Sequence, residues 1–266
     1  MSPPKVVLFD IGGVCVVSPM SAILSYETTH SIPPGYINTA ISASSPTGAW
    51  QRLERGEIPL DASFFSQFKS DLSNPEIWQS FPGTKGPQPP DIDAEALFWR
   101  MMSVSRAPDP NIYPALRRLR RYADSGERKG GFIVAACSNT VIFPEGHAFN
   151  DPSTEEGKFN AELKGNFHLF VSSAHVGRRK PDPAMYQFTL AECERVAREK
   201  GVLGKDERLD PADVIFLDDI GSNLRGAKKA GIKGIKVVMG RTADAVQQLQ
   251  DVTGLDLTSP DDKAKL

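Results

Sequence analysis

Short runs of apolar residues recur along the chain, and several of them are followed at once by a polar residue. They are Lys5 to Asp10 (KVVLFD), Phe132 to Cys137 (FIVAAC), a weaker run from Leu169 to Ser172, Val214 to Leu217 (VIFL), and Ile235 to Met239 (IKVVM). Because they do not alternate between apolar and polar positions, they are typical of buried strands in a parallel sheet. Helices are expected from Pro114 to Ala123, Pro183 to Glu199 and Ser222 to Ala230. This alternation of strands and helices predicts an α/β fold.

The pattern changes between Ser18 and about Pro108, where strand-like runs vanish and helical ones dominate. Trp50 to Glu57 and Ala62 to Leu72 are examples. Phe81 to Pro90 is a loop rich in Pro and Gly, and Phe143 to Lys158 is interpreted as a polar insertion. We therefore predict an α/β core formed by residues 1–17 and 109–250, a helical cap formed by residues 18–108, and a C-terminal tail over residues 251–266.

Composition and net charge bear on which partners the protein can have. The chain has 266 residues, of which 40% are hydrophobic and 24% charged, with a formal net charge of -2. Nothing in that charge indicates a nucleic acid or an anionic membrane as a partner. The basic run from Arg117 to Arg121 fits the solvated face of a helix. No apolar run approaches the roughly 18 residues of a membrane span.

The cysteines and the N-terminus suggest a compartment. Cys15, Cys137 and Cys193 show no metal-binding spacing and are odd in number, which indicates reduced thiols in a reducing environment. The N-terminus lacks the pattern of a signal peptide. We therefore expect a cytoplasmic protein, and the sequence does not predict an oligomeric state.

Polar residues stand where several of the predicted strands end. Asp10 ends the first strand, Ser138 and Asn139 follow the second, and the pair Asp218-Asp219 follows the fourth. Lys180, in GRRKPDP, precedes a helix. Because the carboxyl ends of parallel strands meet at one edge of a sheet, we expect these side chains to converge there.

The converging residue types suit phosphoryl transfer. A carboxylate can attack phosphorus and form an aspartyl-phosphate, and a divalent cation bound by carboxylates offsets the charge repulsion. A lysine and a hydroxyl can hold the transferring oxygens. Backbone N–H groups of a glycine-rich turn, Gly13 among them, can approach a phosphate closely. Each residue alone is an ordinary loop, cap or surface residue, and only the ordered set is specific.

These motifs resemble those of the haloacid dehalogenase-like (HAD) hydrolase superfamily. The matching segments are FDIGGV, CSN, the lysine of RRKPDP, and FLDD. VIFLDDIGSNLRGAKKAG and SSAHVGRRKPDPAMY are similar to the phosphatase domain of soluble epoxide hydrolases. FDIGGVCVVSP, TTHSIPPGYI and WQRLERGEI resemble the HAD domain of acyl-CoA dehydrogenase family member ten. The resemblance spans most of residues 5–240 and implies a Rossmann-like parallel sheet with an inserted helical cap.

The resemblance also implies a magnesium site. By position, Asp10 is the nucleophile and first metal ligand, and Gly12 offers its backbone carbonyl to the metal. Asp219 aligns with the metal-binding acid, and Asp218 has a supporting role.

The remaining motif positions concern the substrate. The resemblance implies that Ser138 and Asn139 hold the phosphate and the substrate. It implies that Lys180 neutralises charge on Asp10 and on the phosphoryl group. The substrate expected from these roles is a small-molecule phosphate ester, whose identity the sequence does not give.

One position departs from the family pattern. Most phosphatases of this superfamily carry a second aspartate where this chain has Gly12, and that residue acts as general acid and base. Glycine keeps the backbone carbonyl but not the proton transfer, which contributes about 10²–10⁴-fold. A good leaving group, a water or a cap residue could compensate. Glu54, Glu57 and His30 belong to the presumed cap, but the sequence does not place them at the site and a surface position is favoured for each. His175 is expected near the third motif, where a structural role is at least as well favoured.

Two functions from different classes follow. The first is a magnesium-dependent HAD-type phosphatase, slowed by Gly12. The alternative is a catalytically weak HAD-fold binding or regulatory protein. Carbon–halogen cleavage is less favoured, because family members that catalyse it need no magnesium and carry an aromatic residue at the position of Gly12. Epoxide hydrolysis would need a separate domain with a nucleophile elbow, which this chain does not show.

Overall fold

The computed structural model describes residues 3–126 and 130–259, and its framework is a five-stranded parallel sheet. The strands are β1 (Val6–Phe9), β2 (Ile133–Ser138), β3 (Leu169–Ser172), β4 (Val214–Asp218) and β5 (Lys233–Lys236). They lie in the order β3-β2-β1-β4-β5, with Phe9 of β1 opposite Ala136 of β2 and Leu217 of β4. The chain moves outward from β1 to β3 and then returns to the other side of β1. The carboxyl ends of β1 and β4 therefore form the switch point at which open α/β sheets bind ligands.

Helices cover both faces of the sheet. They include α7 (Ile112–Ser125), α10 (Pro183–Glu199), α11 (Gly221–Lys229) and α12 (Thr242–Thr253). Val7 and Phe9 pack in the apolar cluster under α7 and α12, whereas Val6 and Leu8 pack on the opposite face, under α10 and α11. Burial on both faces explains why the strands are continuously apolar. The predicted α/β architecture is confirmed.

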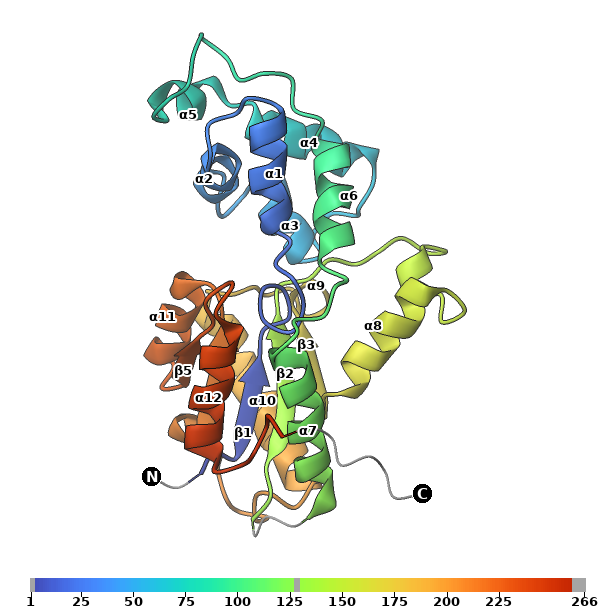
Figure 1. The fold of residues 1–266 in the computed structure, drawn as a ribbon, viewed down its shortest axis with the longest axis vertical. Coiled ribbons are helices and arrows are strands. Elements are labelled where there is room, and N and C mark those ends of the chain that lie inside the picture. Colours follow the sequence, from blue (N-terminus) through green and yellow to red (C-terminus); the bar gives the residue numbers. More distant parts are fainter. Residues whose placement is uncertain (1–2, 127–129, 260–266) are drawn as a thin grey trace.

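A second group of helices stands beyond the carboxyl ends of the strands (Figure 1). Its members are α1 (Ser21–Thr29), α2 (Tyr36–Ala43), α3 (Ala49–Glu54), α4 (Ala62–Leu72), α5 (Pro75–Ser80) and α6 (Ala94–Val104). They enclose their own apolar cluster, in which Phe64 and Phe98 are fully buried. The buried Glu27 carboxylate accepts the backbone N–H groups of Gly35 and Ile37 at the start of α2. This group follows β1 in sequence, where the helical segment was expected.

The fifth strand lies earlier in the sequence than predicted. The expected run was Ile235 to Met239, but β5 begins at Lys233 and ends at Lys236. Lys236 lies opposite Asp218, the last residue of β4, so strand pairing stops there. Three of the four β5 residues are exposed at the sheet edge, which is why the apolar pattern did not mark this strand.

The segment from Phe143 to Lys158 is more ordered than a polar insertion. It contains a 3-10 turn, η1 (Ala148–Asn150), and the start of α8 (Glu155–Gly165). Thr154 caps α8 by accepting the Gly157 N–H at 3.0 Å. The helix was missed because its exposed sequence carries little apolar periodicity. The loop from Phe81 to Pro90 has no helix or strand, as expected.

The C-terminal boundary also needs correction. The predicted tail begins at residue 251, but α12 continues to Thr253, and Leu257 is buried in the same cluster as Val246 and Leu249. The predicted division therefore falls inside a helix. Residues 260–266 of the predicted tail lie outside the described part of the chain.

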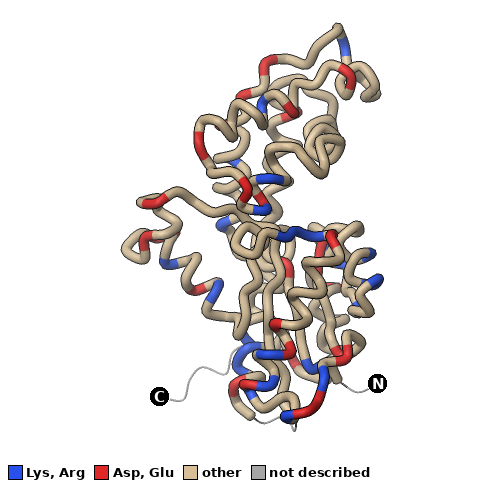
Figure 2. The backbone as a smooth tube through the Cα atoms, turned by 180° about the vertical axis from the view of Figure 1, so that it is seen from behind, with Lys and Arg blue, Asp and Glu red and all other residues tan. Residues whose placement is uncertain are grey.

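Charges of both signs are interspersed along the backbone (Figure 2). On α7, Leu116 and Leu119 are buried and the basic run lies between and beside them, as expected for a helix with one solvated face. Cys15, Cys137 and Cys193 are free and buried. Among the described residues, no helix combines the length and apolar character needed to cross a bilayer.

His168 makes the stability of the sheet depend on pH. Its side chain is 3% exposed, and its Nδ1 accepts the Val134 N–H at 3.0 Å while Nε2 lies 3.1 Å from Asp124. Nδ1 must therefore be unprotonated in the folded state. Burial lowers the pKa of His168, the Arg120 and Lys200 charges act in the same direction, and Asp124 opposes them.

We expect the free energy of unfolding to fall as the pH drops below about 6.5, because the unfolded state then binds a proton that the folded state resists. Urea unfolding at pH 7.5 and 5.5 measures this, with His168→Gln as the comparison. The variant should lose less stability than the wild type over this interval. An equal loss in both proteins would show that His168 does not cause the effect.

Candidate active site

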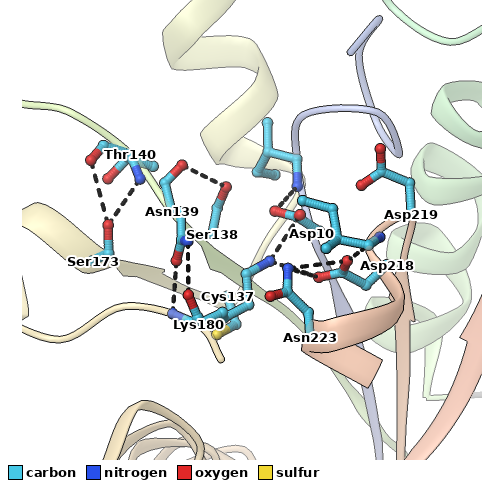
Figure 3. Close-up of polar contacts among 12 residues, drawn as sticks. Asp10, Cys137, Ser138, Asn139, Thr140, Ser173, Lys180, Asp218, Asp219 and Asn223 are labelled. Atoms are coloured by element: carbon cyan, nitrogen blue, oxygen red, sulfur yellow. Dashed lines mark hydrogen bonds and ion pairs between the residues drawn. The ribbon is translucent and has the colours of Figure 1, made fainter. Parts of the chain in front are cut away.

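A cavity of about 1070 Å³ lies where the carboxyl edge of the sheet meets the helical group. Asp10, Ser138, Asn139, Lys180 and Asp219 all line it. They come from β1, β2 and β4 or the loops just after these strands, and from the loop before α10. The structure thus brings together the residues that the strand-end argument selected, and Figure 3 shows their side chains.

Lys180 is the centre of the site. Its side chain is fully buried, and Nζ lies 2.8 Å from Asp10 Oδ2 and 2.8 Å from Asp218 Oδ2. Asn139 holds the backbone on both sides of this lysine: its Oδ1 accepts the Lys180 N–H at 2.8 Å, and its Nδ2 donates to the Lys180 carbonyl at 3.1 Å. In this arrangement the Asn139 side chain positions Lys180, whereas the sequence suggested that it holds substrate.

Burial and neighbouring charges shift the pKa values of Lys180, Asp10 and Asp219. Burial alone would lower the pKa of Lys180, but the carboxylates of Asp10 and Asp218 more than offset it and raise that pKa. Burial raises the pKa of Asp10 to about 7; Lys180 opposes this shift, while Asp218 and Asp219 add to it. Burial and Asp218 likewise raise the pKa of Asp219 to about 6. Three acids this close repel one another, so a cation would favour their ionised forms.

The three carboxylates differ in how much capacity they have for a cation. Ligand atoms of Asp10, Asp218 and Asp219 lie within 4.8 Å of one another. Both oxygens of Asp218 already accept hydrogen bonds from Asn223, and they also bind Ile220 N–H and Lys180. Asp219 Oδ1, in contrast, is buried and has no hydrogen-bond partner among the residues that the structure describes. Each oxygen of Asp10 has one partner, the Ile11 N–H for Oδ1 at 2.7 Å and Lys180 for Oδ2. Asp10 and Asp219 therefore have more capacity for a cation than Asp218, which is committed to supporting Lys180.

Two glycines shape the turn after β1 for different reasons. Gly13 has φ +77°, and a Cβ there would lie 2.2 Å from Asp219 Oδ2, so only glycine fits beside that carboxylate. Gly12 has no such backbone constraint, but its Cβ would lie 3.0 Å from Pro19 Cδ. Pro19 thus occupies the space next to the position where the family usually places its second aspartate.

Of the other acids and bases that the sequence analysis considered, Glu54 and His175 line the cavity. Glu54 lines the cavity, but its Oε2 is bound by Arg179 at 2.7 Å. Glu57 is exposed and pairs with Arg55. His30 stacks on a tyrosine of α1. Only His175 lines the cavity with a ring nitrogen bound to a hydroxyl, that of Ser172, at 2.7 Å.

Sequence reasoning missed three residues of the site. Asn223 bonds both oxygens of Asp218, and Thr140 and Ser172 line the cavity with their hydroxyls 2.5 Å apart. Ser172 ends β3, so the strand-end rule could have found it. Asn223 lies five residues after Asp218 at the start of α11, and that short spacing was the available indication.

Sequence comparison finds relatives that match nearly the whole chain. No family model matches. Mouse acyl-CoA dehydrogenase family member 10 is 28% identical over 253 residues, covering 95% of this chain and 19% of that protein. Rat bifunctional epoxide hydrolase 2 is 24% identical over 251 residues, covering 94% of this chain and 39% of that protein. The chain therefore spans well under half the length of these relatives.

Solved structures share the fold. A crystal structure of a dehalogenase matches with a TM-score of 0.52 at 17% identity, covering 96% of this chain and all of that one. A HAD family enzyme from Bacteroides thetaiotaomicron matches with a TM-score of 0.50 at 16% identity, covering 90% of this chain and 96% of that one. This chain therefore shares the fold of HAD family enzymes and is similar in sequence, over nearly its whole length, to parts of these two longer relatives.

Proposed function

We propose that the protein is a magnesium-dependent phosphatase that hydrolyses a small phosphate ester through an aspartyl-phosphate on Asp10. The observation that carries the proposal is the pairing of Asp10 with the buried Lys180 at 2.8 Å, next to the unpartnered carboxylate oxygen of Asp219. A nucleophile, a fixed positive charge and an open ligand atom then share one cavity. We further propose that residues 18–108 act as a cap that selects the substrate, because their helices contribute to the cavity wall.

The residues of the chain divide the reaction between them. An Asp10 oxygen attacks phosphorus, and the leaving oxygen departs with the bonding electron pair. Lys180 holds the Asp10 carboxylate in place and balances negative charge as it builds up on the phosphoryl oxygens. Ser138 is buried, with 3% of the residue exposed, and lines the cavity; its hydroxyl donates a hydrogen bond to the same oxygens. Water then hydrolyses the aspartyl-phosphate and regenerates Asp10.

A divalent cation fits this site. Asp10, Asp219 and the carbonyl oxygen of Gly12 would hold it, since carboxylate and carbonyl oxygens are the ligands that magnesium prefers. When bound, it would supply the positive charge that offsets repulsion between the carboxylate and the phosphate. The relatives' names include a hydrolase and a dehydrogenase of other substrates, so the phosphate ester is inferred from the residues of this cavity.

A second candidate is a HAD-fold binding or regulatory protein with weak turnover, and Gly12 favours it. This protein would bind magnesium and phosphate but lack efficient proton transfer. For either candidate we propose a reducing compartment such as the cytoplasm, because the three cysteines are unpaired thiols.

Asp10→Asn should abolish hydrolysis of 4-nitrophenyl phosphate, because the amide is a poor nucleophile and a poor ligand. Wild-type activity should also disappear with EDTA and return with excess magnesium. The assay is release of phosphate, and Asp71→Asn in the helical group is a matched control that should keep activity. Unchanged turnover in Asp10→Asn would exclude the proposed mechanism. A parallel assay for halide release from a 2-haloacid distinguishes the dehalogenase reaction.

Gly12→Asp should raise turnover by about 10-fold or more, because general acid–base catalysis contributes about 10²–10⁴-fold. The new Cβ meets Pro19 at 3.0 Å, so the gain should be larger in Gly12→Asp/Pro19→Ala, where that contact is relieved. Gly12→Ala adds the steric change without the carboxyl group and should bring no gain. Steady-state kinetics on one phosphate ester compare the variants. If neither aspartate variant gains activity, Gly12 is not what limits the rate.

A further inference from the structure

A chain of three polar side chains runs along the cavity wall beside β2 and β3. Thr140 Oγ1 lies 2.5 Å from Ser172 Oγ, and Ser172 Oγ lies 2.7 Å from His175 Nδ1. All three residues line the cavity that contains Asp10. Thr140 comes two residues after Ser138, and Ser172 lies opposite Ser138 on the neighbouring strand, at a strand spacing of about 4.8 Å. The middle residue of this hydrogen-bonded series, Ser172, is therefore the strand neighbour of Ser138, whose hydroxyl is proposed to bind phosphate.

A hydrogen bond to Ser173 fixes the backbone at Thr140, and Ser173 is in turn bonded to the helical group. The Thr140 N–H donates to Ser173 Oγ at 2.8 Å, and Ser173 Oγ donates to the Glu54 carbonyl oxygen at 2.6 Å. Ser173 and His175 belong to the short helix α9 (Ser173–Val176), and Glu54 belongs to α3. The Thr140 backbone is thus held by Ser173, and the Thr140 hydroxyl by Ser172. Figure 3 shows Thr140 and Ser173 on the far side of Asn139 and Ser138 from Asp219.

The direction of the hydrogen bonds depends on the proton at His175. When Nδ1 carries no proton, Ser172 donates to it and Thr140 donates to Ser172. When Nδ1 is protonated, it donates to Ser172, and Ser172 donates to Thr140. The Thr140 proton then has no acceptor among the residues that the structure describes, and it is available to a ligand in the cavity.

We propose that Thr140 is the catalytic proton donor to the leaving oxygen, and that Ser172 and His175 position and resupply its proton. This inference rests on the proposed phosphatase function. The relay supplies part of the proton transfer that Gly12 leaves open, so Gly12→Asp should raise turnover more in Thr140→Val than in the wild type. Glu54 is a weaker candidate, because Arg179 Nε and Nη2 both bind its Oε2. Lys180 is also unavailable, because Asp10 and Asp218 hold its ammonium group.

The proton transfers balance in both half-reactions. As Asp10 attacks and the ester P–O bond breaks, the leaving oxygen takes the Thr140 hydroxyl proton. Thr140 takes one from Ser172, and Ser172 takes one from His175 Nδ1, so the imidazolium becomes neutral. In the second step water attacks phosphorus from the side that the leaving group vacated. Its proton returns through Thr140 and Ser172 to His175, which restores the starting state.

Dependence on the leaving group tests the relay. With magnesium present, kcat/KM is measured for a series of phosphate esters from aryl esters with acidic leaving groups to alkyl esters with basic ones. A basic leaving oxygen needs the proton, whereas 4-nitrophenolate does not. Thr140→Val and Ser172→Ala should therefore lose about 10²–10⁴-fold on alkyl phosphates and little on 4-nitrophenyl phosphate. His175→Gln should show the same pattern.

Two controls separate the relay from a structural role. Thr140→Ser keeps the hydroxyl and should retain the wild-type dependence on the leaving group. Ser42→Ala removes another cavity hydroxyl, which donates to the carbonyl of Asn38 in its own helix; this variant should keep the wild-type dependence on the leaving group. A loss of equal size on every ester, or no loss, would overturn the relay while wild-type turnover still supports the phosphatase. If the wild type hydrolyses no ester in the series, the proposed function itself fails.

Discussion

The structure of the site depends on one buried cation, the ammonium group of Lys180. Removing this charge from water costs several kcal/mol, and only close pairing with anions offsets that cost. Asp10 and Asp218 provide the pairing, each at 2.8 Å. They belong to β1 and β4, which are neighbours in the sheet, and Asn139 at the end of β2 fixes the lysine backbone. Three strand ends are therefore held in register around one side chain.

Because Lys180 must be paired, the carboxylates of Asp10, Asp218 and Asp219 differ in their hydrogen-bond partners and therefore in their roles. Asp218 is fully occupied by Asn223, Ile220 and Lys180, so it serves the structure. Asp219 keeps a buried oxygen without a partner, and Gly13 leaves room for it. Asp10 is intermediate in the number of its hydrogen-bond partners: Lys180 orients its carboxylate, and the residue still lines the cavity. The tasks follow from hydrogen-bond partners that the sequence letters alone do not distinguish.

The convergence of Asp10, Ser138, Lys180 and Asp219 could be predicted because parallel strands end at one edge. The apolar runs also predicted four of the strands closely. β5 was misplaced because an exposed edge strand lacks an apolar pattern, and α8 was missed for the same reason.

Contacts between distant segments were beyond prediction. Glu54 of α3, for example, meets Arg179, which lies next to Lys180 in the sequence. Such contacts depend on how two packed units meet, which no local periodicity encodes. The bonds of Asn139 to the Lys180 backbone illustrate the same limit, because residues 139 and 180 are far apart in the sequence. The role of Asn139 in holding substrate stays a prediction.

Acid-quenched turnover followed by peptide mass spectrometry tests the central claim most directly. With magnesium and a phosphate ester present, the account predicts a transient phosphoryl group on the peptide that contains Asp10. It should be absent from Asp10→Asn. Turnover by the wild type with a phosphoryl group on another residue, or with no phosphorylated peptide at any quench time, would contradict the account.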